Sequence, residues 1–238
     1  MRITSMRAGI LVVLAGLALG IGCGPAEGQA LQRGPLVVEL FTSQGCSSCP
    51  PADRLLSKLA RNGDLAPLSF HVDYWDDLGW ADPFASPAWT ARQRAYAQSL
   101  GEDRVFTPQL VIGGTQSVVG SNERAVSAAL AKAARPARLP ITSKWERDAL
   151  TVTTTAPGDA DVFVAVWQAT TTTQVARGEN AGAQLRSDRV VRRLERVAKA
   201  GATATIRIPV APTWRSVGAL AFAQSRDSRI VASAALTP

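Results

Sequence analysis

The stretch ELFTSQGCSSCPP, residues 39–51, places Cys46 and Cys49 at C-x-x-C spacing between an apolar strand and a helix. Residues 35–41 form a short, β-branched, apolar run that suits a buried strand. Residues 52–60 repeat leucines at helical spacing. The rest of the chain is therefore expected to hold these two thiols in place and to serve their chemistry.

The helix after the thiols carries Asp53 in its first turn, where the positive end of the helix dipole favours an acidic group. A residue before a proline avoids the α conformation, so we expect Cys49 and Pro50 to be non-helical and the helix to begin at Pro51. A helix amino terminus also stabilises a thiolate, so the pKa of Cys46 is expected to be lowered.

Two cysteines at this spacing can exchange disulfides through the first thiol. Three other interpretations stay open: a structural disulfide, a metal site in which His71 joins the pair, and a cysteine hydrolase that uses Cys46 with His71. His71 is the only histidine in the chain. Redox exchange is favoured, because a two-residue spacer closes too short a loop to stabilise a fold much.

The amino-terminal segment, residues 1–30, has the pattern of a secretory signal peptide with cleavage after Ala30. Its apolar run, residues 10–19, is too short to span a bilayer. Cys23 raises an alternative in which it is lipidated and anchors the protein to a membrane. Removal of residues 1–30 leaves an even pair of cysteines, which fits an oxidising compartment, so we expect a periplasmic or secreted protein without a transmembrane segment.

The net charge of +7 is spread over the chain, with one basic cluster late in the sequence. A charge run of this kind usually forms a solvated face, and no aromatic interleaving or nucleic-acid motif accompanies it. We therefore expect no nucleic acid among the partners. The cluster consists of Arg186, Arg189, Arg192, Arg193 and Arg196.

Composition divides the mature chain into residues 31–135 and 141–238, joined by a proline-bracketed linker at residues 136–140. The first part alternates strand-like and helix-like segments in the order β-α-β, α, β-hairpin, α, which is the order of the thioredoxin fold. Ser86 and Ser121 are expected to cap its second and third helices. A hairpin is expected around residues 113–115.

The second part reads as all-β, because threonine and valine dominate and helical signals stop. Its six predicted strands suit a small sandwich. We expect the insert at residues 174–188 to pack toward the first domain and restrict access to Cys46. The predicted strands cover residues 149–155, 161–168, 189–194, 202–208, 218–224 and 230–234.

Five motifs resemble the family called domain of unknown function 1223, whose members are exported proteins with a thioredoxin-like domain. The resemblance covers nearly the whole mature chain and implies the fold, an α/β thioredoxin-like domain followed by a small all-β sandwich-like domain, and an exported location. The motifs are residues 37–53, 71–76, 79–87, 107–109 and 178–180.

Similarity to thioredoxin-like proteins implies roles for further residues. Pro108 takes the position of their cis-proline, preceded by Thr107, and leaves backbone groups free to pair with an extended substrate. Glu39 is similar to the buried acid beneath the thioredoxin dithiol, one residue farther upstream, and either relays a proton for Cys49 or has a structural hydrogen-bonding role. Trp75 and Trp80, in the loop after the second strand, are expected to wall the site.

The sequence thus predicts an exported thiol-disulfide oxidoreductase in which Cys46 attacks and Cys49 resolves. Its partners would be protein or small-molecule thiols and disulfides, and it would need no cofactor beyond the redox-active Cys46–Cys49 disulfide. One alternative is a periplasmic protein that binds Cu(I) through Cys46, Cys49 and His71. Another is a non-catalytic binding protein that keeps the disulfide as a staple.

Overall fold

The computed structural model describes Met1 and residues 33–238, and a nine-stranded sheet joins the two halves of that chain. The predicted signal peptide, its cleavage site and Cys23 lie outside the described residues. From Arg33 on, the described chain contains twelve strands and three helices in one compact unit. None of these helices is long and apolar enough to cross a bilayer.

Residues 36–132 contain the predicted helices and strands in the predicted order. Strand β1 pairs in parallel with β2 and antiparallel with β3, and β3 pairs antiparallel with β4. The elements are β1 (Leu36–Thr42), α1 (Pro50–Leu59), β2 (Leu65–His71), α2 (Pro87–Leu100), β3 (Gln109–Ile112), β4 (Gln116–Val119) and α3 (Glu123–Lys132).

Strand β1 is buried on both faces, and its alternation separates two cores. Val38 and Leu40 pack with apolar residues of α1 and α3. Val37 and Phe41 pack with α2, and this second core also includes Phe222 from the carboxyl-terminal part of the chain. The apolar packing around β1 therefore already draws on both halves of the sequence.

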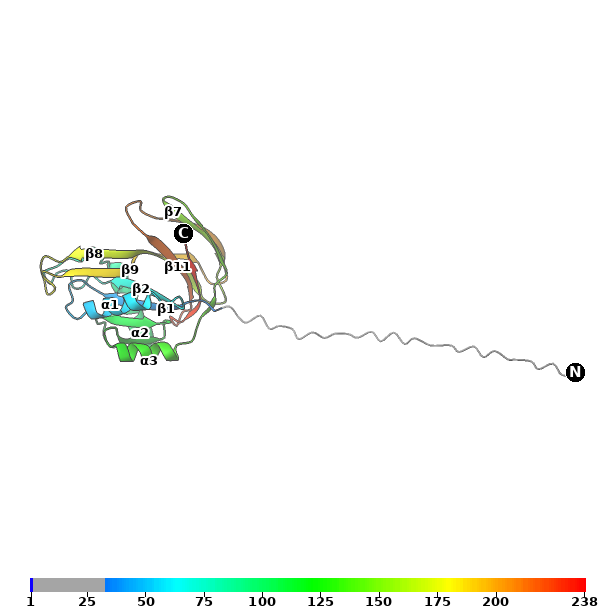
Figure 1. The fold of residues 1–238 in the computed structure, drawn as a ribbon, viewed down its shortest axis with the longest axis horizontal. Coiled ribbons are helices and arrows are strands. Elements are labelled where there is room, and N and C mark those ends of the chain that lie inside the picture. Colours follow the sequence, from blue (N-terminus) through cyan, green and yellow to red (C-terminus); the bar gives the residue numbers. More distant parts are fainter. Residues whose placement is uncertain (2–32) are drawn as a thin grey trace. The chain divides into compact units, whose positions relative to one another are not determined.

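The carboxyl-terminal half adds five strands to the same sheet, in the order β4-β3-β1-β2-β9-β8-β11-β12-β5. Strand β9 pairs in parallel with β2 at Ser69 and Val190. The other three strands form a separate sheet, and Figure 1 shows β7 of that sheet curving over the β11 end of the molecule. The elements are β5 (Ala137–Arg138), β6 (Ile141–Trp145), β7 (Ala149–Thr155), β8 (Asp161–Gln174), β9 (Gln184–Ala198), β10 (Thr203–Pro209), β11 (Val217–Gln224) and β12 (Ile230–Leu236).

The predicted fold class, an α/β thioredoxin-like domain followed by a small all-β sandwich-like domain, is wrong. The protein is mostly β, and its nine-stranded sheet curls into a half-barrel to which both halves contribute. Four of the six strands predicted for the sandwich continue the first sheet instead. Residues 136–140, which the sequence predicted as a linker, contain β5, and β5 pairs with β12. Alternation identified the strands, but it carries no information on which strands pair.

Helix capping agrees with the sequence in one case and differs in another. The Ser86 side chain accepts a hydrogen bond from the backbone N–H of Ala88 and caps α2, as predicted. Asn122, not Ser121, caps α3 by accepting from the backbone N–H of Ala125. Serine and asparagine are both favourable N-cap residues, so residue type alone does not decide which of these two neighbours caps the helix.

Candidate functional site

The loop between β1 and α1 carries both cysteines. Cys49 has α conformation, with φ −78° and ψ −38°, and α1 begins at Pro50 rather than at Pro51. The expectation that Cys49 is non-helical is therefore wrong. Its carbonyl oxygen accepts hydrogen bonds from the backbone N–H groups of Ala52 and Asp53, at 2.9 and 3.1 Å, and these bonds hold Cys49 in the first turn despite the proline that follows.

The two thiols are buried side by side but differ in acidity. A hydrogen bond from Cys49 outweighs the effect of burial and lowers the pKa of Cys46 from 9.0 to about 6. Burial raises the pKa of Cys49, and the thiolate of Cys46 raises it further. Cys46 is 0% exposed, and its sulfur lies 3.2 Å from the hydroxyl of Ser48. The pair is thus arranged as one thiolate and one protonated thiol.

The predicted cis-proline segment lies against the first thiol. The peptide bond between Thr107 and Pro108 is cis, and the carbonyl oxygen of Thr107 is 4.0 Å from the sulfur of Cys46. The indole N–H of Trp75 donates to the hydroxyl of Thr107 at 2.9 Å. A Cβ atom at Gly45 would lie 3.0 Å from the Cβ of Trp75, so a larger residue there would require Trp75 to shift slightly. Of the predicted site residues, Thr107 therefore lies against Cys46, Trp75 is bonded to Thr107, and Pro108 follows it through the cis bond.

Trp80 reaches the same loop by a different route. Its indole N–H donates to the side-chain oxygen of Gln44 at 3.1 Å, and the amide nitrogen of Gln44 donates to the hydroxyl of Thr173 at 3.0 Å. Trp80 therefore anchors the loop that precedes Cys46, and Gln44 of that loop connects it to the end of β8.

Glu39 is not beside the dithiol. Its carboxylate accepts two hydrogen bonds from the guanidinium of Arg92 on α2, at 2.7 and 2.9 Å, and it is buried at the same core as Phe41. The guanidinium also lies over the rings of Phe70, Tyr96 and Phe222. The single-residue offset from the thioredoxin pattern turns Glu39 toward α2, because successive residues of a strand face opposite sides. This arrangement corresponds to the structural alternative in the sequence analysis.

Asp53 supplies the buried acid on the thiol side, and the sequence analysis did not assign it this role. Its carboxylate accepts a hydrogen bond from the hydroxyl of Thr42 at 3.2 Å. Burial raises the pKa of Asp53 from 3.8 to about 7. Its negative charge raises the pKa of Cys49. The signal was the spacing, because Asp53 follows Cys49 by four residues and so shares a helix face with it.

His71 forms a buried pair with Asp82. The ring nitrogen Nδ1 lies 2.6 Å from the carboxylate of Asp82, and that carboxylate also accepts backbone N–H donors from Gln44 and Phe84. Within the described residues, no group of three or more His, Cys, Asp and Glu side chains is arranged to hold a metal ion. The structure thus pairs the histidine of the copper alternative with a carboxylate.

The tip of the β8–β9 hairpin contacts the cysteine loop. The side-chain amide of Asn180 donates to the carbonyl oxygens of Gln44 and Cys46, at 2.9 and 3.0 Å, and Glu179 accepts from the backbone N–H of Ser47 at 3.0 Å. Gly178 has φ +77°, and a Cβ there would lie 3.1 Å from the Cβ of Trp80. The predicted packing of residues 174–188 toward this loop is confirmed, and Figure 1 shows the hairpin running past α1.

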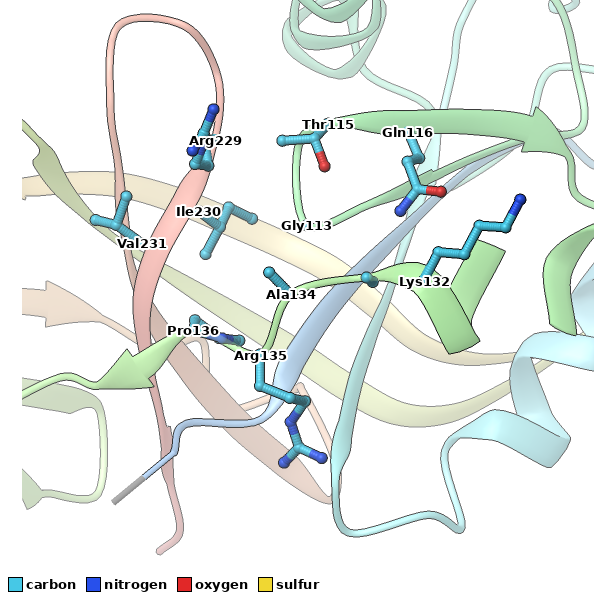
Figure 2. Close-up of a pocket in the computed structure, with 11 residues that line it drawn as sticks. Gly113, Thr115, Gln116, Lys132, Ala134, Arg135, Pro136, Arg229, Ile230 and Val231 are labelled. Carbon is cyan, nitrogen blue, oxygen red and sulfur yellow. The ribbon is translucent and has the colours of Figure 1, made fainter. Parts of the chain in front are cut away.

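A separate cavity of about 470 Å³ lies between the β3–β4 turn, the end of α3 and β12. Figure 2 shows the guanidinium of Arg135 pointing away from Thr115 and Gln116. That guanidinium donates to the backbone oxygen of Gly34 and to the carboxylate of Asp64. The cavity contains none of the predicted site residues, so the thiol loop remains the candidate site.

Comparisons with known proteins agree with this organisation of the chain. A family model described as "Protein of unknown function (DUF1223)" matches residues 37–224. The crystal structure of protein AGR_C_4864 from Agrobacterium tumefaciens is similar, with 32% identity, a TM-score of 0.68 and coverage of 87% of this chain and 96% of that one. HBP35 of Porphyromonas gingivalis shares the fold at 13% identity, with a TM-score of 0.57 and coverage of 87% and 76%. No curated protein matches the chain.

Proposed function

Because the chain belongs to the DUF1223 family, whose description names no reaction, we infer its function from the site: it is a thiol-disulfide oxidoreductase that works through Cys46 and Cys49. The observation that carries the proposal is the unequal acidity of the two thiols. The pKa of Cys46 is lowered to about 6, whereas burial raises that of Cys49. A thiolate beside a protonated thiol is what sequential disulfide exchange requires.

The first step is attack of the Cys46 thiolate on a substrate disulfide. A bond forms between Cys46 and one substrate sulfur, the substrate S–S bond breaks, and the other sulfur leaves as a thiolate. The segment Thr107–Pro108 and Trp75 would contact the substrate, because the Thr107 carbonyl lies against the Cys46 sulfur and Trp75 is hydrogen-bonded to Thr107. Protein or small-molecule disulfides are both candidate substrates for this step.

The second step is resolution by Cys49. Its thiol gives a proton to the carboxylate of Asp53, and the resulting thiolate attacks the sulfur of Cys46. The mixed disulfide breaks, the second substrate thiolate leaves, and the Cys46–Cys49 disulfide forms. The substrate gains the two electrons that the dithiol loses, and the reverse sequence oxidises a substrate dithiol. Asp53 takes the proton-transfer role expected of Glu39, because Glu39 is paired with Arg92.

The proposed compartment is a periplasm or the exterior of the cell. It rests on the signal-peptide pattern of residues 1–30 and on the even pair of cysteines that remains after cleavage. In such a compartment a dithiol can cycle between reduced and oxidised states.

The first test is the reduction potential of the Cys46–Cys49 pair, measured in the metal-free mature protein by equilibration in glutathione buffers and trapping of free thiols. A value of roughly −120 to −270 mV, the range of known exchange proteins, supports the proposal. A value below roughly −300 mV indicates a structural staple and contradicts it.

Three variants test the individual roles. Cys46→Ser should form no mixed disulfide with oxidised glutathione, and Cys49→Ser should form one that persists. Asp53→Asn should form the mixed disulfide normally but resolve it about 100-fold more slowly, because the general base is missing. Equal rates of resolution in Asp53→Asn and the unaltered protein would remove Asp53 from the mechanism.

A further inference from the structure

His71 lies at the end of β2 directly beside Thr42, its register partner on β1. Both side chains are buried, and the hydroxyl of Thr42 donates to Asp53. His71, Thr42 and Asp53 therefore occupy neighbouring positions beneath the start of α1. The proposed exchange reaction does not use His71.

The imidazole is arranged to carry a positive charge. Burial alone would lower the pKa of His71, but the nearby carboxylates of Asp82 and Asp53 raise it above its ordinary value of 6.5. For Asp82, burial favours the protonated form, but the imidazolium and the N–H donors of Gln44 and Phe84 together lower its pKa below 3.8. A buried charge costs free energy unless it is paired, and this pair compensates both charges.

The second ring nitrogen, Nε2, is buried and has no hydrogen-bond partner among the described residues. Buried polar groups are nearly always hydrogen-bonded, so this unsatisfied nitrogen is a destabilising feature that the core alone does not explain. A hydrophobic side chain at this position would avoid the cost. The buried ring, paired with Asp82 through Nδ1, therefore points to an electrostatic role.

The nearest group that can respond to this charge is Asp53. Burial raises its pKa to about 7, the charge of His71 acts in the opposite direction, and the smaller effect of the Asp82 carboxylate raises it. Without the imidazolium, the buried carboxyl of Asp53 would be protonated over a wider pH range. A protonated Asp53 cannot accept a proton from Cys49.

We propose that the His71 imidazolium, held in place by Asp82, is a positioning charge that favours the ionised form of Asp53, so that Asp53 can accept the proton of Cys49 during resolution. The inference rests on the proposed function and deepens it. His71 acts through Asp53 and does not touch the reacting sulfur atoms. Asp82 holds the imidazole charged and fixes its orientation through Nδ1.

Several charged and ring groups face His71 from different elements. Asp53 belongs to α1, Asp82 belongs to the loop after β2, and Arg192 on β9 opposes the positive charge of the imidazole. The ring of Phe84 packs edge-on against the imidazole at a centroid distance of 5.5 Å. Removal of the His71 charge should therefore raise the pKa of Asp53, whereas removal of Asp82 has two opposed effects, because its carboxylate itself raises that pKa.

The test compares His71→Gln with the unaltered protein in single-turnover resolution of a Cys46–glutathione mixed disulfide, over a range of pH. This variant should shift the rising limb of the pH–rate profile upward by about one pH unit, which slows resolution about fivefold near pH 7 and about tenfold at lower pH. Glu123→Gln, which removes an exposed charge paired with Lys58, is the matched control and should leave the profile unchanged.

The double variant His71→Gln/Asp53→Asn distinguishes positioning from a general structural effect. If His71 acts through Asp53, it should resolve at the same rate as Asp53→Asn alone. A further loss of rate in the double variant would overturn the proposal, and so would an unshifted profile in His71→Gln.

A direct titration keeps this inference separate from the proposed function. The carboxyl carbon of Asp53, followed by NMR in the reduced protein, should titrate at higher pH in His71→Gln than in the unaltered protein. No change in that midpoint overturns the inference. A shifted midpoint in a protein that exchanges no disulfide would instead contradict the proposed function and leave the charge coupling in place.

Discussion

Two buried acids lie on opposite sides of strand β1, and their surroundings differ. Glu39 faces α2 and forms two hydrogen bonds with Arg92, whose guanidinium is also stacked on aromatic rings. Asp53 faces the thiols, where its carboxylate accepts a hydrogen bond from the neutral hydroxyl of Thr42. The comparison teaches that burial does not define a chemical role. An acid with a matched cation stabilises the fold, whereas one without a direct cation can exchange a proton.

The largest expected effect is on the Glu39 side. Glu39→Gln leaves the guanidinium of Arg92 buried without its counter-charge, and such a loss costs about 3–5 kcal/mol. Urea unfolding should show this decrease in the free energy of unfolding. The folded fraction should retain the rate of disulfide exchange, and a selective loss of exchange in the folded protein would place Glu39 in the mechanism after all.

On the Asp53 side, removal of the acid is expected to change the free energy of unfolding in the opposite direction as pH rises. A carboxyl whose pKa rises from 3.8 to about 7 on folding stabilises the fold fully at low pH, and this stabilisation is lost as pH increases between the two values. Asp53→Asn does not titrate, so its stability relative to the unaltered reduced protein should increase by about 3 kcal/mol between about pH 4 and pH 8. A difference that stays constant with pH would show that Asp53 titrates normally.

A smaller effect concerns the thiol pair itself. The hydrogen bond from Cys49 is the main cause of the low pKa of Cys46, so Cys49→Ala should raise the midpoint from about 6 by about one unit or more toward 9.0. Ultraviolet absorbance of the thiolate in a protein made of residues 31–238 measures this titration, because Cys46 is then its only cysteine. Serine at position 49 is the control, since its hydroxyl can still donate.

The smallest expected effect is at the hairpin tip. Asn180→Ala removes two hydrogen bonds to the backbone of the cysteine loop, which should lower stability by about 1 kcal/mol. Alkylation of Cys46 should become faster, because its burial depends on the order of that loop. An alkylation rate equal to that of the unaltered protein would show that the hairpin does not limit access.

The same contrast explains what the sequence could predict. The strand before the cysteines and the helix after them could be predicted from local periodicity. The place of the Thr107–Pro108 segment beside the thiols could be predicted from a family resemblance. Glu39 is one residue out of register with the thioredoxin pattern, and successive strand residues face opposite sides of the sheet. The sequence therefore left two alternatives for Glu39, a proton relay and a structural role. Asp53 could have been identified from its spacing to Cys49.

Other features depend on contacts between distant segments. The pairing of β9 with β2 at Ser69 and Val190 merges two predicted domains, and nothing in either strand specifies its partner. The His71–Asp82 pair joins a strand end to a loop eleven residues later. Each of these features arises from tertiary packing, which local propensity and residue spacing do not predict.

The hydrogen bond from the Asn180 side chain to the Cys46 carbonyl also determines when the site is assembled. The two residues are 134 positions apart, so this contact forms only after the β8–β9 hairpin has been made and has reached the first half of the chain. Until that contact forms, the β8–β9 hairpin does not cover the cysteine loop of the folding chain. The interval before that contact forms is therefore the period in which Cys46 is most open to unintended pairing with other thiols, and slower hairpin docking would lengthen it.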